Sequence, residues 1–265
     1  MRLLVLSIAL IVLAFAFRFV ERRPARRWTD PSIRTDIAYW FFTPWVSRAV
    51  TIATVATALL AASWALGLRI RVTELSTLLT ARGPLALQPR WLQAIEVLFL
   101  SDGLGYWTHR LFHGGRLWRF HAVHHGSEHL DWLSSVRAHP VNEALMRVAQ
   151  VLPLVGLGFD PRVLAATAPV FSIYALLLHA NVDWRFGPLR YAIASPAFHR
   201  WHHAADRAAV DKNFAGLFPI WDLLFGTFHL PAQAPERFGV LDAQLPPALW
   251  AQMWWPFKPG EAVSR

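Results

Sequence analysis

The stretch "FHAVHHGSEH" (residues 120–129) places His121, His124 and His125 within five positions. The stretch "FHRWHHAADR" (residues 198–207) repeats the same spacing with three further histidines. Offsets of three and four residues bring side chains to one face of a helix. The two stretches therefore predict two helices that each present a face of imidazole rings.

Three more histidines extend this pattern. His109 and His113 are four residues apart, and His179 ends an apolar run in "LLLHAN". A single histidine is usually a hydrogen-bonded imidazole, but nine packed rings would repel one another when protonated and leave acceptor nitrogens unpaired when neutral. A bound metal removes both difficulties. The nine candidate ligands are His109, His113, His121, His124, His125, His179, His199, His202 and His203.

The number of histidines indicates how many ions they hold. A catalytic zinc takes about three protein ligands and a structural zinc takes four, so nine ligands fit two ions with four or five each. The chain has no cysteine, which excludes thiolate ligands and iron–sulfur clusters. Imidazole binds iron, copper, zinc and nickel, and the spacing leaves the choice among them open.

Other polar residues are candidates for supporting roles. His139, in "RAHPVNE", is predicted to be either a ligand or a partner of one. A metal-bound imidazole usually donates its other N–H to a carboxylate or carbonyl oxygen. Asp102 lies seven residues before His109, on the same helical face, and together with Asp211 and Asp222 it is a candidate for that role.

The composition predicts a membrane protein. Hydrophobic residues make up 55% of the 265 residues and charged residues only 16%, whereas a soluble domain has about a quarter charged residues. The net charge of +9 comes almost entirely from arginines beside apolar segments. Such arginines are typical of topology signals and lipid headgroup contacts rather than of nucleic-acid binding.

The apolar segments predict an all-α integral membrane bundle of about four to five membrane helices or hairpins, with a cytoplasmic histidine-rich helical cap. Six arginines between Arg18 and Arg34 indicate that this segment is cytoplasmic. If each following apolar run crosses the membrane in turn, every histidine cluster lies on the cytoplasmic face as well. The expected membrane is a bacterial inner membrane or the endoplasmic reticulum. Four arginines (Arg69, Arg71, Arg82 and Arg90) would lie on the other side, against this rule. The apolar runs are residues 3–17, 49–68, 91–106, 143–157 and 163–178, the last two joined by a tight turn at "GFDP".

Seven motifs resemble the fatty acid hydroxylase superfamily, also called the sterol desaturase family. They are "DGLGYWTHRLFH", "LWRFHAVHH", "RAHPVNE", "LLLHAN", "FHRWHH", "DKNFAG" and "WDLLFGTF", and they extend from about Leu98 to Phe228. The resemblance implies a membrane di-iron enzyme that uses O2 and two electrons to hydroxylate or desaturate a lipid C–H bond. The last two motifs also resemble the alkylglycerol monooxygenase branch.

The resemblance also implies roles for parts of the chain. It makes the nine histidines the ligands of two iron ions and assigns Asn181 and Asn213 to orienting them. The apolar runs and arginines predict N-terminal membrane helices and a basic loop at residues 1–90, the resemblance implies a catalytic domain at 91–230, and the aromatic residues of the last part predict an interfacial tail at 231–265. The expected partners are a lipid from the bilayer and a separate electron donor, such as a cytochrome, a ferredoxin or a reductase, with no nucleic acid.

Two other functional classes accommodate the histidines. One is a metal transporter or metal-storing membrane protein, although transporters place ligands near the bilayer midplane and these clusters lie at predicted helix ends. The other is a structural membrane protein with an inactive, metal-stabilised cap, which the intact set of nine ligand positions disfavours.

Overall fold

The protein is seen in a computed structural model, which describes residues 2–21, 29–65, 67, 84–241 and 243–258. Within these residues every regular element is a helix, and the only β pairing is an isolated bridge between Ala204 and Phe238. The all-α prediction is confirmed. Most of the arginines expected to set topology, in residues 22–28 and 68–83, lie outside the described residues.

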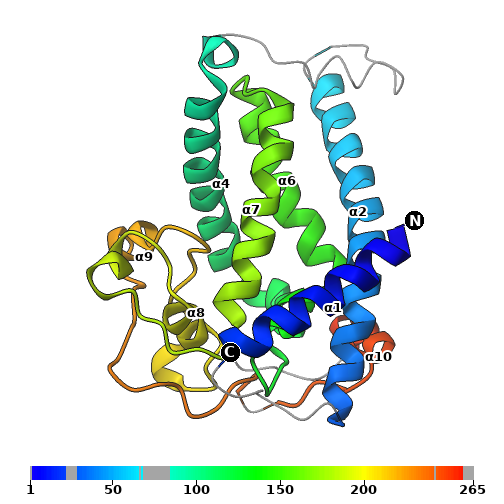
Figure 1. Ribbon diagram of the computed structural model, residues 1–265. Coiled ribbons are helices and arrows are strands. Elements are labelled where there is room, and N and C mark those ends of the chain that lie inside the picture. Colours follow the sequence, from blue (N-terminus) through cyan, green and yellow to red (C-terminus); the bar gives the residue numbers. More distant parts are fainter. Residues whose placement is uncertain (1, 22–28, 66, 68–83, 242, 259–265) are drawn as a thin grey trace.

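Four long helices stand side by side (Figure 1). They are α2 (Pro31–Ala65), α4 (Arg90–Phe112), α6 (Pro140–Gly156) and α7 (Pro161–His179). Helices α2 and α6 lead away from one end of the bundle, and α4 and α7 return to it (Figure 1). The histidines near the ends of α4 and α7 therefore lie at the same end, as the alternating runs predicted.

The turn between α6 and α7 follows from its sequence. Gly158 adopts a left-handed φ of 92°, which costs a glycine little. The Asp160 carboxylate accepts the N–H of Arg162 (2.8 Å), and Pro161 occupies the first position of α7. A side-chain cap followed by proline is a strong start for a helix. The tight turn predicted at "GFDP" is confirmed.

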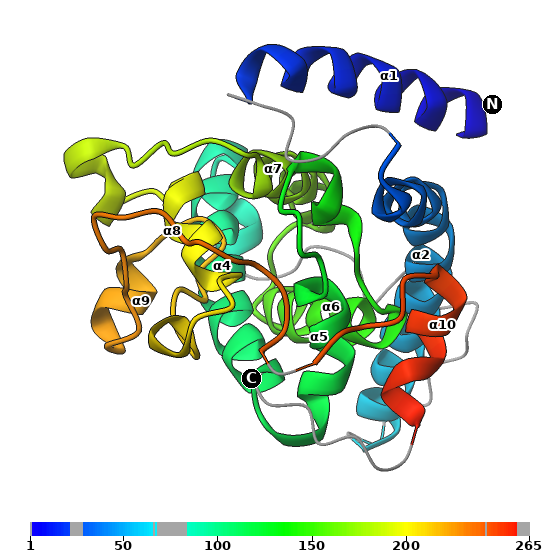
Figure 2. The ribbon, with the colours of Figure 1, turned by 90° about the horizontal axis from the view of Figure 1, so that it is seen from below.

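Helix α1 (Arg2–Val20) departs from the expected bundle, because it crosses the other helices instead of running beside them (Figures 1 and 2). Its C-terminal end is held by the cap: Phe17 stacks on Trp132 with ring centroids 5.2 Å apart, and Glu21 accepts the N–H of Asn181 (2.9 Å). Two helices in the described part of the chain are long and apolar enough to cross a membrane, at Leu3–Val20 and Pro161–His179. A count of four to five therefore stays a prediction.

Short helices form a cap below the bundle. They are α5 (Trp118–His125), α8 (Pro196–His202), α9 (Ile220–Leu224) and α10 (Leu249–Trp254), with 3-10 turns at Gly115–Leu117, Trp132–Val136, Gly187–Tyr191, Arg207–Ala209 and Trp255–Phe257. A further 3-10 turn, Pro84–Leu87, lies at the other end of the bundle, before the start of α4. Buried polar contacts join the cap to α2: Arg137 donates to Asp36, and the Tyr39 hydroxyl donates to Gln252 (2.8 Å). A buried ion pair is costly to break, so the cap is fixed relative to the bundle.

Candidate metal centre

Nine imidazole rings converge in the cap, just below the ends of α4 and α7. Helix α4 carries His109 and ends beside His113, and His179 is the last residue of α7. The two triplets lie on and just after α5 and α8. Helix α8 is only seven residues long, but the Ser195 hydroxyl accepts the N–H of Phe198 (3.2 Å) at its start and fixes its direction.

The rings fall into two groups. Within each group, one ring nitrogen of every histidine lies within 4.8 Å of those of the others. Neighbours in sequence point to different groups because successive residues of a helix are about 100° apart. The five-histidine group is His109, His113, His121, His125 and His202, and the four-histidine group is His124, His179, His199 and His203.

Hydrogen bonds to carbonyl oxygens fix the tautomers of four rings. Nδ1 of His109 donates to the carbonyl of Phe214 (2.8 Å), and Nδ1 of His202 donates to that of Lys212 (2.7 Å). In the other group, Nδ1 of His124 donates to the carbonyl of Arg137 (2.9 Å), and His179 does the same within its own helix. Because a carbonyl only accepts, Nδ1 carries the proton, and Nε2 of each neutral ring carries a lone pair.

These lone pairs point at one another. His124 Nε2 lies 3.3 Å from His179 Nε2, and His109 Nε2 lies 2.9 Å from His121 Nε2. The first contact joins two nitrogens without protons and is therefore no hydrogen bond. Nε2 of His202 is buried without a hydrogen-bond partner among the described residues. Two nitrogens that each lie about 2.1 Å from a shared ion, at tetrahedral or octahedral angles, are about 3.0–3.4 Å apart, so the geometry fits a bound cation in each group.

Burial keeps these rings neutral. Desolvation, followed by the charge of neighbouring imidazoles, lowers the pKa of His125 and His203 well below the usual value of a histidine. Desolvation lowers the pKa of His124 to about 4. A metal binds the neutral imidazole, so both groups are ready to bind a cation at neutral pH.

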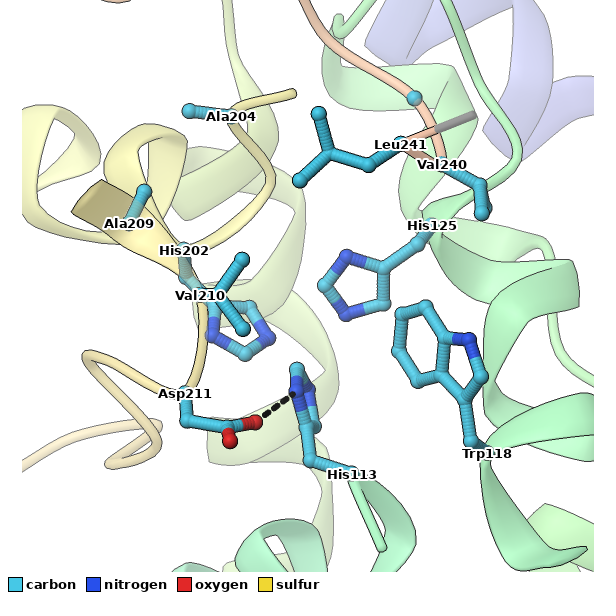
Figure 3. Close-up of a pocket in the computed structure, with 11 residues that line it drawn as sticks. His113, Trp118, His125, His202, Ala204, Ala209, Val210, Asp211, Val240 and Leu241 are labelled. Atoms are coloured by element: carbon cyan, nitrogen blue, oxygen red, sulfur yellow. Dashed lines mark ion pairs between the residues drawn. The ribbon is translucent and has the colours of Figure 1, made fainter. Parts of the chain in front are cut away.

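A small cavity within the cap borders the five-histidine group (Figure 3). Three of its wall residues are His113, His125 and His202, and the rest are mainly apolar, among them Trp118 and Val240. Its volume of about 20 Å³ suits one water-sized molecule. A lipid chain is too large to approach the rings by this route.

The comparisons with known proteins agree with this geometry. A family model described as fatty acid hydroxylase matches residues 94–227, which include all nine histidines. The chain belongs to the fatty acid hydroxylase family. The predicted superfamily is thus confirmed, and the relatives of the chain include alkylglycerol monooxygenases.

This member of the fatty acid hydroxylase family is similar to several curated proteins. Ornithine lipid hydroxylase OlsE of Rhizobium tropici is 33% identical over 172 residues, covering 63% of this chain and 52% of that protein. Human alkylglycerol monooxygenase is 36% identical over 133 residues, covering 49% and 29%. Very-long-chain aldehyde decarbonylase GL1-6 of Oryza sativa subsp. japonica is 30% identical over 137 residues, covering 47% and 21%. The chain thus spans about half the length of these relatives or less, and no solved structure matches it.

The predicted carboxylate partners behave in two ways in this family member. Asp211 lies beside a ligand candidate, with Oδ1 3.5 Å from Nδ1 of His113 (Figure 3). Asp102 and Asp222 were expected to accept imidazole N–H groups directly, and that prediction is wrong. Their carboxylates accept backbone N–H groups of residues 214–218, because this loop lies between them and the rings.

His139 does not belong to either histidine group. Its Nδ1 accepts the N–H of Val141 (3.2 Å) at the start of α6, and its Nε2 donates to the carbonyl of Met253 (3.1 Å). Both ring nitrogens are therefore used by the backbone, and the ligand alternative for His139 is wrong. It joins α6 to the C-terminal segment.

The two asparagines expected to orient ligands are placed differently. Asn213 has a left-handed φ of 59° and joins two segments through its side chain, donating to the carbonyls of Phe198 (2.8 Å) and His229 (2.6 Å). It supports the backbone next to the rings and does not bond to a ring itself. Asn181 follows the ligand candidate His179 by two residues, and its backbone N–H is held by Glu21.

Sequence reasoning missed Asn142, whose Oδ1 accepts Nδ1–H of His121 (3.1 Å). The residue stands in "RAHPVNE", in the first turn of α6, where a buried amide needs a partner. That requirement was the available signal. The carbonyl acceptors of four other rings, those of His109, His124, His179 and His202, belong to the backbone and leave no mark in the sequence.

Proposed function

We propose that this chain is a membrane-bound, O2-dependent oxidoreductase that hydroxylates a C–H bond of a lipid and holds two iron ions with its nine clustered histidines. The observation that carries the proposal is the facing Nε2 lone pairs in two separate groups, inside the segment that matches the family. The relatives are named for an ornithine lipid, an alkylglycerol and a long-chain aldehyde. A lipid with a long hydrocarbon chain is common to all three.

The two histidine groups and the rest of the chain would have separate roles in this reaction. The five-histidine and four-histidine groups would each hold one ion. Bound iron would supply the redox chemistry in which O2, two electrons and two protons convert R–H into R–OH and water. Removal of two hydrogens, with release of two waters, is the desaturation alternative. The chain itself supplies oriented rings, a dry site and the placement of one substrate carbon.

The proposed location is a membrane with the cap on the cytoplasmic face. Helix α7 is apolar enough to span, and α1 carries exposed apolar side chains such as Ile11 and Phe15. The end of α1 and the start of α2, which flank the basic segment, lie at the cap end of the bundle (Figure 1), and positive residues favour the cytoplasm. The clusters lie beyond the bundle, whereas a transporter holds its ions near the midplane.

The expected partners follow from the chemistry. The lipid would enter from the bilayer toward the end of the bundle, and the two electrons would come from a separate cytochrome, ferredoxin or reductase. The division into membrane helices (1–90), catalytic domain (91–230) and interfacial tail (231–265) is part of the same proposal. It agrees with the exposed aromatic residues of the last segment, Trp250, Trp254 and Phe257, which are typical of a membrane interface.

Two measurements test the proposal. After anaerobic reconstitution with Fe(II), elemental mass spectrometry of the detergent-solubilised protein should find two iron ions per chain. Lipid extracts of cells that express the protein should contain a lipid heavier by one oxygen atom, which cells expressing His202→Ala lack. Less than one iron per chain, together with unchanged lipids, would contradict the proposal.

A further inference from the structure

One loop, residues 212–218, orients two rings of the five-histidine group. The carbonyl of Phe214 accepts from Nδ1 of His109, and the carbonyl of Lys212 accepts from Nδ1 of His202. These bonds fix the tautomer and the direction of each ring. The position of the loop backbone therefore determines where two Nε2 lone pairs point.

Two buried carboxylates hold the loop through five consecutive N–H groups. Asp222 accepts those of Phe214 (2.8 Å) and Ala215 (2.9 Å). Asp102 accepts the next three, those of Gly216 (3.1 Å), Leu217 (2.8 Å) and Phe218 (2.8 Å). Both side chains are almost fully buried, where these hydrogen bonds are not exchanged with water and leaving a polar group unpaired is costly.

The carboxylates connect the loop to the element that carries a ligand. Asp102 stands on α4, two turns before His109, so one helix both supplies the ring and holds the backbone that orients it. Close packing permits this contact: a Cβ on Gly103 would lie only 2.7 Å from Cζ2 of Trp221. The loop and α4 therefore have little freedom to shift against each other.

The four-histidine group contacts this loop only indirectly, through α8: Asn213 donates to the carbonyl of Phe198 (2.8 Å), and the carbonyl of Leu217 accepts the N–H of Ala194 (2.9 Å). The fixed rings of this group donate to the carbonyls of Arg137 and Ala175, which belong to the segment before α6 and to α7. A change in the position of residues 212–218 would therefore redirect two rings of the five-histidine group directly, and none of the fixed rings of the other group.

We propose that Asp102 and Asp222 are positioning residues of the five-histidine site, acting through the backbone of residues 212–218, whose carbonyls accept from two rings of that site. The proposal rests on the proposed function, since it requires that each group binds a metal. Loss of a group that helps to orient a metal-binding imidazole commonly weakens metal binding by roughly 10–100-fold. We expect an effect of that size at the five-histidine site only.

The test titrates the detergent-solubilised full chain with Co(II) and follows the visible absorption of the bound ion. His202→Ala, which lacks a five-group ligand, and His203→Ala, which lacks a four-group ligand, would give the spectrum of each remaining site. Asp102→Asn and Asp222→Asn keep the side-chain size but replace a carboxylate oxygen with an N–H-bearing group. Asp160→Asn is the matched control, because that carboxylate only caps α7 at its exposed start.

We expect Asp102→Asn and Asp222→Asn each to bind one Co(II) as tightly as the unchanged chain does, with the same spectrum as His202→Ala. The second Co(II) should bind at least tenfold more weakly. Asp160→Asn should bind both normally. Normal binding at both sites in the variants would overturn the inference, as would loss of both sites or of the folded protein in both. If the unchanged chain itself binds no Co(II) or Fe(II), the proposed function fails instead.

Discussion

His124 and His125 are adjacent in the sequence, but their rings belong to different groups. His124 Nε2 lies 3.3 Å from His179 Nε2, and His125 Nε2 lies 3.2 Å from His121 Nε2. The pair His202 and His203 divides in the same way. The repeated HxxHH pattern thus has a geometric reason, because one short helix can serve two sites only if neighbouring rings diverge.

This division predicts that single substitutions remove single metals. His125→Ala should reduce iron from two ions per chain to about one by disabling the five-histidine site, and His124→Ala should do the same at the other site. Both should abolish lipid hydroxylation, because the chemistry needs both ions. His129→Ala is the control, since that ring is half-exposed beside Asp30 and outside both groups. Two retained ions in either cluster variant would contradict the ligand assignment.

His139 should behave as a structural residue. His139→Ala removes the side-chain cap of α6 and the bond to Met253, and we expect a loss of stability of about 1–2 kcal/mol. Metal content should stay at the level of the unchanged chain. Thermal unfolding and elemental analysis of the same sample check both statements, and a fall to one ion per chain would restore the ligand reading.

The sequence predicts those parts of the metal centre that side chains form, and it does not predict those that depend on the backbone. The nine rings converge as their helical spacing indicates, because that spacing is written in side chains. Asp102 and Asp222 were assigned one step too close to the metal, since hydrogen bonds of a side chain to a distant backbone segment have no pattern in the sequence. The crossing of α1 was missed for a related reason: its apolar composition indicates burial in lipid or protein but not direction, which its contacts with the cap decide.

The buried rings predict how the metal-free protein responds to acid. In the unfolded chain a histidine takes up a proton near pH 6.5, whereas in the folded chain the pKa of His124 is about 4 and that of His203 is also lowered. Below pH 6.5 the unfolded state therefore binds more protons than the folded state, and stability is lost as the pH falls toward 4.

The measurement is the unfolding temperature of the metal-free protein between pH 7.5 and 5, two pH values chosen on either side of about 6.5. It should fall with decreasing pH, and His203→Gln should show a shallower fall because one such group is gone. Bound metal competes with protons for the same nitrogens, so the loaded protein should resist acid better. An unfolding temperature that is constant over this range would contradict the burial of neutral rings.

The contact between α4 and α9 predicts a contrast between two glycines. Gly103→Ala would place a methyl group 2.7 Å from the rigid indole of Trp221, and overpacking of this kind costs about 1–3 kcal/mol. Gly156→Ala, at the end of α6, meets no atom within 4 Å and should be neutral or slightly stabilising, because alanine favours helix. Unfolding of both variants in detergent checks the contrast. Because Gly103 neighbours Asp102, Gly103→Ala should also weaken metal binding at the five-histidine site. Equal stability of the Gly103→Ala and Gly156→Ala proteins would show that α4 and the 214–222 segment are not closely packed.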